Sequence, residues 1–170
     1  LGSHSRNFGP VSVMATPESK RGPSRLLAFR LGATTPFPYP HVTVPLVPKP
    51  PVQTADAAVI KHGALVYSKF SCSDCHSPQA DGAGAWVVDG AFPDLRYMPA
   101  DVHSQFLGIV LGGSHREHGM PGFGPGAGWP LEQTKMTVEE ANAVHAYIID
   151  LEWKAYNAEQ TKLHAGKATH

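Results

Sequence analysis

The sequence lacks an excess of charge of either sign. Lysine and arginine total 14, aspartate and glutamate also total 14, and the formal net charge at pH 7 is zero. Charged residues make up 16% of the chain, against ~25% in a typical globular domain. Binding to nucleic acid or to a strongly anionic membrane surface depends on excess positive charge. The composition therefore argues against both kinds of partner.

Cysteine and long apolar runs are also scarce. The two cysteines, Cys72 and Cys75, lie three positions apart. A pair this close cannot close a long loop, which excludes a disulfide scaffold. No apolar run approaches the ~18 residues of a transmembrane helix, and no signal peptide is visible. Because the first residue is Leu1 and not methionine, we expect a processed or trimmed chain.

Glycine and proline, in contrast, are abundant, at 17 and 16 residues. Such a composition indicates much irregular backbone, with something other than long helices or wide sheets organising the core. Seven of the prolines fall within residues 34–52. Proline-rich chain is extended and semi-rigid, so we assign residues 33–54 to a linker. Its interleaved hydrophobic residues suit a strap laid across a surface.

Residues 1–32 predict a β-hairpin. Two strand-like runs, 11–15 and 25–31, flank a stretch rich in turn residues. A lone hairpin is at best marginally stable in water. Residues 1–32 are therefore either a small hairpin lying on the main domain or the last strand pair of a larger β domain.

Residues 55–156 predict a compact, mostly helical domain. Helical spacing of apolar residues runs through 56–70 and 100–111, and Gly112 with Gly113 is expected to end the second helix. Residues 137–140 carry a capping-box signature that opens a third helix.

Two further expectations concern the ends of this domain. Gly63 and Tyr147 are expected to touch where the first and last helices cross. The polar remainder, residues 157–170, is expected to be a frayed tail.

The motif that carries chemistry is Cys-Ser-Asp-Cys-His at residues 72–76. C-x-x-C-H is the attachment signature for a c-type haem. The two thiols of Cys72 and Cys75 add to the two haem vinyl groups, and so must lie a fixed distance apart on one turn of chain. His76 then lies beneath the ring and ligates the iron. We therefore predict one covalent haem c, with His76 as a metal ligand.

Two other readings of the cysteine pair stay open. A zinc site needs four nitrogen or sulfur ligands, and the chain has no second C-x-x-C, although other histidines can complete a set with His76. A redox dithiol of the thioredoxin type requires a βαβ setting, which the sequence does not predict.

For the sixth iron ligand we favour Met120. It lies in the loop Gly-Met-Pro-Gly at residues 119–122, whose glycines permit a close approach to a ring. His/Met ligation is typical of electron transfer. Met98 and Met136 are expected to be core residues, and Met14 lies in the hairpin. His115 and His118 are the alternative ligands, interpreted here as solvated loop residues.

Residues after the motif are expected to support the haem. The carbonyl of Pro93 is placed to accept a hydrogen bond from the ring of His76, and Leu95 is placed to cover a haem face. Three residues are candidates to reach the propionates: Trp86, Arg96 and Tyr97. Arginine suits carboxylates because its guanidinium is a planar fork.

With these residues together, residues 55–156 resemble a class I cytochrome c domain. More narrowly, they look like the C-terminal cytochrome domain of quinohaemoprotein alcohol dehydrogenases, in which a β-propeller binds pyrroloquinoline quinone (PQQ) and a linker leads to the cytochrome. The matching segments are residues 72–76, 93–97, 109–113, 119–121 with Phe123, and 144–148. Residues 24–31 resemble the strand that closes the propeller.

This resemblance implies electron transfer from the PQQ site to a downstream acceptor, either a small redox protein or a quinone system. The residues that bind PQQ, calcium and alcohol are expected only in a propeller domain absent from this sequence, so no catalytic residue is assigned here. A c-type haem also implies maturation outside the cytoplasm, and we expect a periplasmic protein. Residues 124–129 look longer and richer in glycine than the family leads us to expect.

Two alternatives remain within the haem interpretation. In the first, the chain is a stand-alone cytochrome subunit that docks onto a separate dehydrogenase. In the second, it is a haem sensor or enzyme with an open distal site. Such a site binds carbon monoxide or holds high-spin iron.

Overall fold

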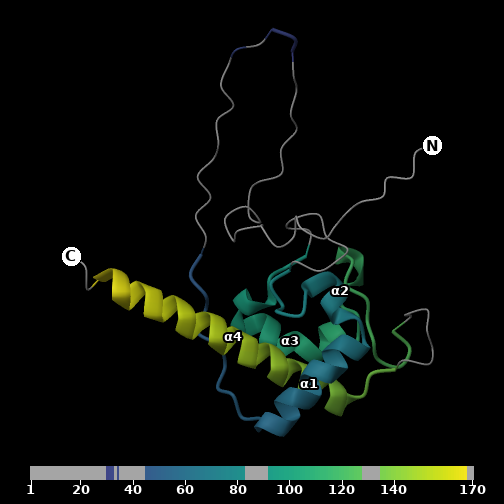
Figure 1. Cartoon of the computed structure of the whole chain (residues 1–170). Helices are drawn as coiled ribbons and strands as arrows, with labels where there is room; N and C mark the ends of the chain where they lie inside the picture. The colour runs from purple at the N-terminus through teal and green to yellow at the C-terminus, as the bar shows by residue number, and fades with distance from the viewer. Residues whose placement is uncertain (1–29, 33, 35–44, 83–91, 128–134, 168–170) are drawn as a thin grey trace.

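The fold is mostly helical. In the computed structural model the described residues are 30–32, 34, 45–82, 92–127 and 135–167, and no strand occurs among them. The elements run in the order α1 (Ala57–Lys69), α2 (Cys72–His76), η2 (Leu95–Tyr97), α3 (Ala100–Val110), η3 (Arg116–His118) and α4 (Val138–Lys167). α1 crosses α4, and α3 lies beside them (Figure 1).

The helices begin where their capping residues stand. Asp56 accepts a hydrogen bond from the backbone N–H of Val59 at 2.9 Å and opens α1. The predicted capping box at α4 is confirmed: Thr137 Oγ1 accepts from the N–H of Glu140 at 3.1 Å, and Glu140 accepts from the N–H of Thr137 at 3.0 Å. These bonds satisfy N–H groups that have no partner within a helix.

The first and last helices cross at the predicted pair, Gly63 and Tyr147. A Cβ atom on Gly63 would stand 1.9 Å from the carbonyl oxygen of Ala143 and 3.0 Å from Cβ of Tyr147. The backbones of α1 and α4 therefore approach as closely as they do only because residue 63 has no side chain. Lys69 of α1 adds an ion pair to Glu140 at 2.7 Å.

The prediction of a frayed tail from residue 157 was wrong, since α4 continues to Lys167. The segment 157–165 contains neither glycine nor proline, so nothing in it breaks a helix. Figure 1 shows these C-terminal turns extending beyond the rest of the helical body.

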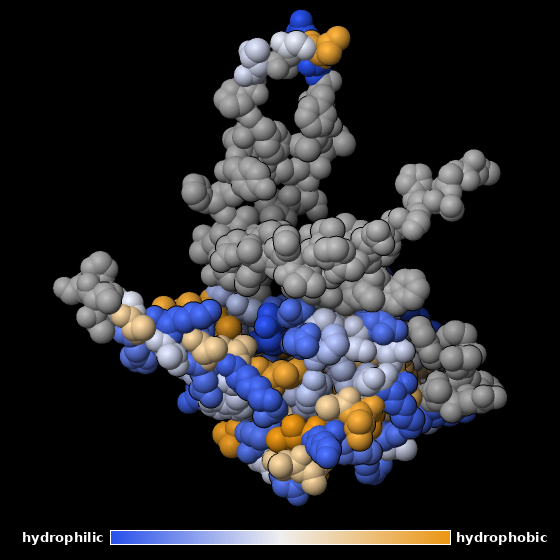
Figure 2. All heavy atoms as spheres, viewed as in Figure 1, coloured by the Kyte–Doolittle hydropathy of each residue, from blue (hydrophilic) through white to orange (hydrophobic). Residues whose placement is uncertain are grey.

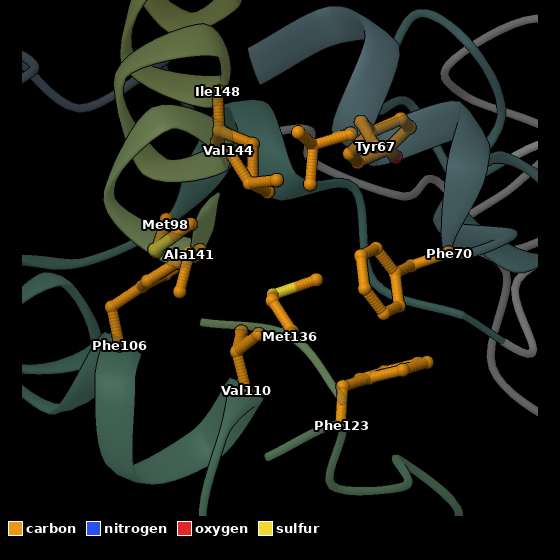
Figure 3. Close-up of a cluster of buried hydrophobic side chains, with 11 residues drawn as sticks. Tyr67, Phe70, Met98, Phe106, Val110, Phe123, Met136, Ala141, Val144 and Ile148 are labelled. Atoms are coloured by element: carbon orange, nitrogen blue, oxygen red, sulfur yellow. The ribbon is translucent and has the colours of Figure 1, made fainter. Parts of the chain in front are cut away.

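A single apolar cluster lies between α1, α3 and α4 (Figure 3). Phe70 and Phe123 meet edge to face, with ring centroids 6.0 Å apart. The buried members are Val66, Tyr67, Phe70, Met98, Phe106, Val110, Phe123, Met136, Ala141, Val144 and Ile148. Met98 and Met136 thus have the core positions expected for them. No described helix is long and apolar enough to cross a membrane.

Residues 45–55, which contain all of the predicted linker that the structure describes apart from Thr34, form neither helix nor strand and lie along α4. Trp153 Nε1 donates to the carbonyl of Pro51 at 2.8 Å, and Gln53 Nε2 donates to the carbonyl of Ala146 at 2.8 Å. The N–H of Val47 donates to the carboxylate of Glu159 at 2.9 Å. We call residues 45–55 the strap.

The predicted hairpin lies almost wholly outside the described residues, which include only residues 30–32 of it. There Leu31 and Gly32 form a turn.

The visible surface is mostly hydrophilic, with hydrophobic side chains gathered over α1 at the bottom of the view (Figure 2). Val59 and Leu65 of α1 are 40% and 64% exposed.

Candidate functional site

The C-x-x-C-H motif forms its own short helix, α2, and left-handed backbone flanks it. Ser71 before the helix has φ 56°, Ser77 after it has φ 67°, and Ala80 has φ 55°. Non-glycine residues adopt this region at a cost, and such strain concentrates at functional sites. Ser71 and Ser77 thus delimit a short helix that carries both thiols and the histidine.

His76 is a buried histidine whose ring is oriented by a backbone carbonyl. Its side chain is buried, with the residue 6% exposed, and Nδ1 lies 3.1 Å from the carbonyl oxygen of Pro93. A carbonyl only accepts, so Nδ1 carries the hydrogen and donates it. Burial lowers the pKa of His76, although the bond to Pro93 acts in the opposite direction. The neutral ring therefore leaves a lone pair on Nε2, the atom that a metal requires.

Two tyrosine hydroxyls hold the turn that follows His76. Tyr67 of α1 donates to the carbonyl of Ser77 at 3.0 Å, and Tyr147 of α4 donates to the carbonyl of Pro78 at 2.7 Å. The two rings meet edge to face at 5.5 Å. The sequence predicted Tyr147 as a packing residue but not these hydrogen bonds. The spacing of apolar residues along a helix does not show which turn carbonyl a tyrosine hydroxyl reaches.

Hydrogen bonds within residues 76–82 also stabilise this turn. Ser77 Oγ donates to Asp81 at 2.6 Å, and the N–H of Gly82 donates to the carbonyl of His76 at 3.0 Å. Gly82 has φ 74°, and a Cβ there would stand 2.6 Å from the carbonyl oxygen of Phe92. Only glycine lets the chain after the motif pass this close to the segment that carries Pro93.

Burial raises the pKa of the Cys72 thiol to about 12 and also raises the pKa of the Cys75 thiol. The described residues contain no group of three histidine, cysteine, aspartate or glutamate side chains that could hold a metal ion. That part of the chain therefore offers no third ligand to join the two thiols in a zinc site, whereas the dithiol alternative stays open.

Met120 lies partly buried against the apolar cluster, as do Cys72 and Leu95. These three predicted site residues, from separate parts of the chain, thus contact one cluster. Met120 is held by its N–H, which donates to the carbonyl of His115 at 3.1 Å. His118 is exposed. Met14 lies outside the described residues. Among the described methionines, Met98 and Met136 are buried members of the cluster, whereas Met120 is half-buried at its edge.

Gly119 and Gly122, the glycines around Met120, determine the backbone conformation of this loop. A Cβ on Gly122 would stand 2.7 Å from the backbone nitrogen of Gly113, so Gly122 lets this loop touch the end of α3. Gly119 has φ 90° and meets no atom within 4 Å. Its role is the left-handed turn before Met120.

Arg96 is paired within its own segment. Its Nε and a terminal nitrogen donate to the two oxygens of Asp94 at 2.9 and 2.8 Å. This pair raises the pKa of Arg96. A propionate contact by Arg96 remains a prediction and would share the guanidinium with Asp94. Tyr97 is half-buried beside it, and Trp86 lies outside the described residues.

The sequence model of the cytochrome c family matches residues 60–152. The chain is 33% identical over 147 residues to the quinohemoprotein alcohol dehydrogenase ADH-IIG of Pseudomonas putida. The aligned region covers 81% of this chain and 18% of that protein. It is 30% identical over 141 residues to a lupanine 17-hydroxylase [cytochrome c] of a Pseudomonas species, covering 83% of this chain and 18% of that protein. This sequence thus spans about a fifth of the length of either relative.

A solved structure of ADHIIG from Pseudomonas putida HK5 superposes with a TM-score of 0.55 at 33% identity, covering 73% of this chain and 16% of that one. The similarity of sequence is accompanied by similarity of fold.

Proposed function

The chain belongs to the cytochrome c family, and from that premise we propose that it transfers single electrons through one haem held by Cys72, Cys75, His76 and Met120. The observation that carries this assignment is His76, which is buried, neutral and oriented by Pro93 at 3.1 Å with Nε2 left for a metal. A histidine serving only as a core residue has no need of a strained turn and two tyrosine hydroxyls behind it.

The residues present fit a covalent haem. The two thiols on one turn of α2 are suited to thioether formation, and the apolar cluster beside Cys72, Leu95 and Met120 offers a hydrophobic wall. When bound, the haem supplies a one-electron iron couple. Pro93 orients the imidazole of His76, and Met120 would supply a thioether sulfur to the iron, with the apolar cluster limiting the access of water.

Met120 as the sixth ligand distinguishes an electron carrier from a sensor or an enzyme. A protein sulfur in that position leaves no open site for dioxygen or carbon monoxide. His/Met ligation also raises the reduction potential relative to two histidines. These properties favour transfer over chemistry at the iron.

For the electron donor we propose a PQQ-dependent dehydrogenase. The support is the similarity to a part of quinohemoprotein alcohol dehydrogenase ADH-IIG and to a part of lupanine 17-hydroxylase. The two relatives are named for different substrates, so alcohol is the narrower proposal. PQQ and calcium would be bound by the dehydrogenase domain, and the strap would connect that domain with the haem. We also propose a periplasmic location, because covalent haem attachment takes place outside the cytoplasm.

Two measurements test this function. The oxidised protein carrying haem is mixed with a PQQ-dependent alcohol dehydrogenase and alcohol, and we expect the haem to be reduced at a rate that rises with dehydrogenase concentration. Carbon monoxide is then added to the reduced protein, and we expect no change in the spectrum. Reduction by dithionite but never by the dehydrogenase would contradict the proposed donor, and carbon monoxide binding would favour the open-site alternative.

The proposed location is tested by expression with the c-type haem attachment system, with and without a periplasmic leader. We expect covalent haem only in the exported form.

A further inference from the structure

A buried cluster of three titratable side chains lies between α3 and α4, apart from the candidate haem ligands. It consists of His103 from α3 and His145 and Glu152 from α4. Nδ1 of His103 lies 2.9 Å from Nε2 of His145. Nε2 of His103 lies 3.3 Å from Oε2 of Glu152, where the two side chains are 8% and 2% exposed. The three groups therefore form a chain: carboxyl, imidazole, imidazole.

The carboxyl group of Glu152 is unusual because nothing compensates its burial. Within the described part of the chain, neither carboxylate oxygen completes a hydrogen bond, and neither does Nε2 of His103. An unpaired buried carboxylate is costly unless it takes up a proton. Burial accordingly raises the pKa of Glu152 to about 8.

The two histidines favour their neutral forms for the same reason. Burial lowers the pKa of His103, and burial together with the charge of His103 lowers the pKa of His145 to about 4. The ring of His145 also stacks on Phe106, with centroids 4.2 Å apart and planes 12° apart. Apolar contact on the ring face gives a charged imidazole no solvation. Burial thus favours the neutral form of all three groups in the cluster.

Other charged groups on the neighbouring elements do not compensate Glu152. Lys154 pairs with Asp150 at 2.7 Å on the exposed side of α4, Arg96 of η2 pairs with Asp94, and Lys69 of α1 pairs with Glu140. Among the other titratable side chains on these elements and on the strap, the half-buried Glu159 accepts from the N–H of Val47 at 2.9 Å. The exposed ones include Lys49, Lys61, His62, Asp101, Glu139, Lys162 and His164, and the phenols are Tyr67, Tyr97, Tyr147 and Tyr156.

A metal ion is not the ligand that this cluster fits. His145 meets Nδ1 of His103, whereas Glu152 meets Nε2 on the opposite side of the same ring. The three groups therefore do not converge on one point. A proton is the species that such a chain binds and passes.

The cluster is joined to the predicted axial ligand by a short stretch of chain. Pro93, whose carbonyl orients His76, is followed by η2 and then by Met98, whose backbone bonds to His103. Phe106 makes a second connection, because it stacks on His145 of the titratable cluster and also belongs to the apolar cluster. Charge is weakly screened in such an interior, which favours coupling between the charge of a haem bound by His76 and the charge of Glu152.

We propose that Glu152, with His103 and His145, is a proton-binding site linked to the haem, so that one-electron reduction of the iron is accompanied by uptake of a proton on the Glu152 carboxylate. The electron comes from a reduced quinone cofactor of the donor or from a chemical reductant, and the proton comes from solvent. The net charge of iron and cluster together then stays unchanged. This inference rests on the proposed function, because it requires a haem.

The test is the midpoint potential of the protein carrying haem, measured from about pH 6 to about pH 10. We expect a potential that is constant at the acid end and falls as pH rises through the range where Glu152 ionises. Glu152→Gln removes the ionisable group with little change in shape, and we expect its potential to be constant across that range. Asp150→Asn, on the exposed side of the same helix, should retain the fall.

A second measurement decides the question if Glu152→Gln does not fold. The infrared difference spectrum of the reduced against the oxidised wild-type protein, taken at about pH 8, should show the C=O band of a carboxylic acid appearing on reduction. A constant wild-type potential, a fall that persists in Glu152→Gln or disappears in Asp150→Asn, or absence of the carboxylic acid band would overturn the proposal. Absence of covalent haem would instead overturn the proposed function, and this inference with it.

Discussion

At the scale of single residues, the site depends on which groups are buried and what they bond to. The C-x-x-C-H motif and the His76–Pro93 bond were predictable, because fixed spacing and a neighbouring proline carbonyl follow from the chemistry of the attached group. The hydroxyl bonds of Tyr67 and Tyr147 and the buried Glu152 were not. A glutamate in a helix is ordinarily solvated, and only the packing of α3 against α4 shows that this one is enclosed.

Glu152→Gln should change how stability depends on pH. The folded-state pKa of Glu152 is raised from 4.5 to about 8, so folding is increasingly disfavoured as pH rises between these values. We expect the variant and the wild type to have similar free energies of unfolding at the acid end. The variant should become more stable by several kcal/mol at the alkaline end. Urea unfolding across this range measures the difference, and a difference independent of pH would contradict the assignment.

Tyr67→Phe should weaken the turn behind His76. The substitution removes the bond to the carbonyl of Ser77 at 3.0 Å and leaves that oxygen with one donor, the N–H of Ala80 at 3.1 Å. We expect a loss of about 0.5–1.5 kcal/mol in the free energy of unfolding, the net value of one hydrogen bond. Tyr156→Phe is the matched control, since Tyr156 meets Trp153 through its ring. Equal losses in both variants would show that the Tyr67 hydroxyl has no special role.

At the scale of helices, capping residues determine where each helix begins and ends, and the close contact of the α1 and α4 backbones at Gly63 determines how these two helices cross. The start of α4 and the end of α3 were predictable from the capping box and the glycine pair, because those signals are local. The continuation of α4 to Lys167 was missed, since polar composition alone does not distinguish a solvated helix from a frayed end. The strap contacts α4 as far along as Glu159, which a reading of local patterns does not reveal.

Gly63→Ala should separate α1 from α4. The added Cβ would meet the carbonyl oxygen of Ala143 at 1.9 Å, and a backbone oxygen cannot move without moving its helix. We expect a loss of ~2 kcal/mol or more, seen as a lower thermal midpoint. Gly108→Ala in α3 is the control, because its Cβ meets no atom within 4 Å. There alanine should stabilise the helix by up to ~1 kcal/mol, and a Gly63→Ala variant that behaved in the same way would contradict the close crossing.

At the scale of the whole molecule, the strap lies against α4 and bonds to it at three places. That the proline-rich segment is a linker between domains stays a prediction. The hairpin of residues 1–32 and its place in a propeller stay predictions.

Trp153→Phe should loosen the strap. The variant loses the bond from Nε1 to the carbonyl of Pro51 at 2.8 Å while keeping an aromatic ring. We expect a broad-specificity protease to cut within residues 45–55 several times faster than in the wild type. Asn157→Ala, an exposed change on the same helix, should leave the cutting rate unaltered. An unchanged rate in Trp153→Phe would show that this bond does not hold the strap.

The account as a whole depends on one haem attached to Cys72 and Cys75 and ligated by His76 and Met120. The absorption spectrum of the loaded protein, recorded with and without dithionite, tests it most directly when wild type and Met120→Ala are compared. We expect sharp low-spin α bands in the reduced wild type and a sulfur-to-iron charge-transfer band in the oxidised form. Met120→Ala should lose the charge-transfer band. A Met120→Ala spectrum identical to that of the wild type, or a wild type with high-spin iron, would contradict the account.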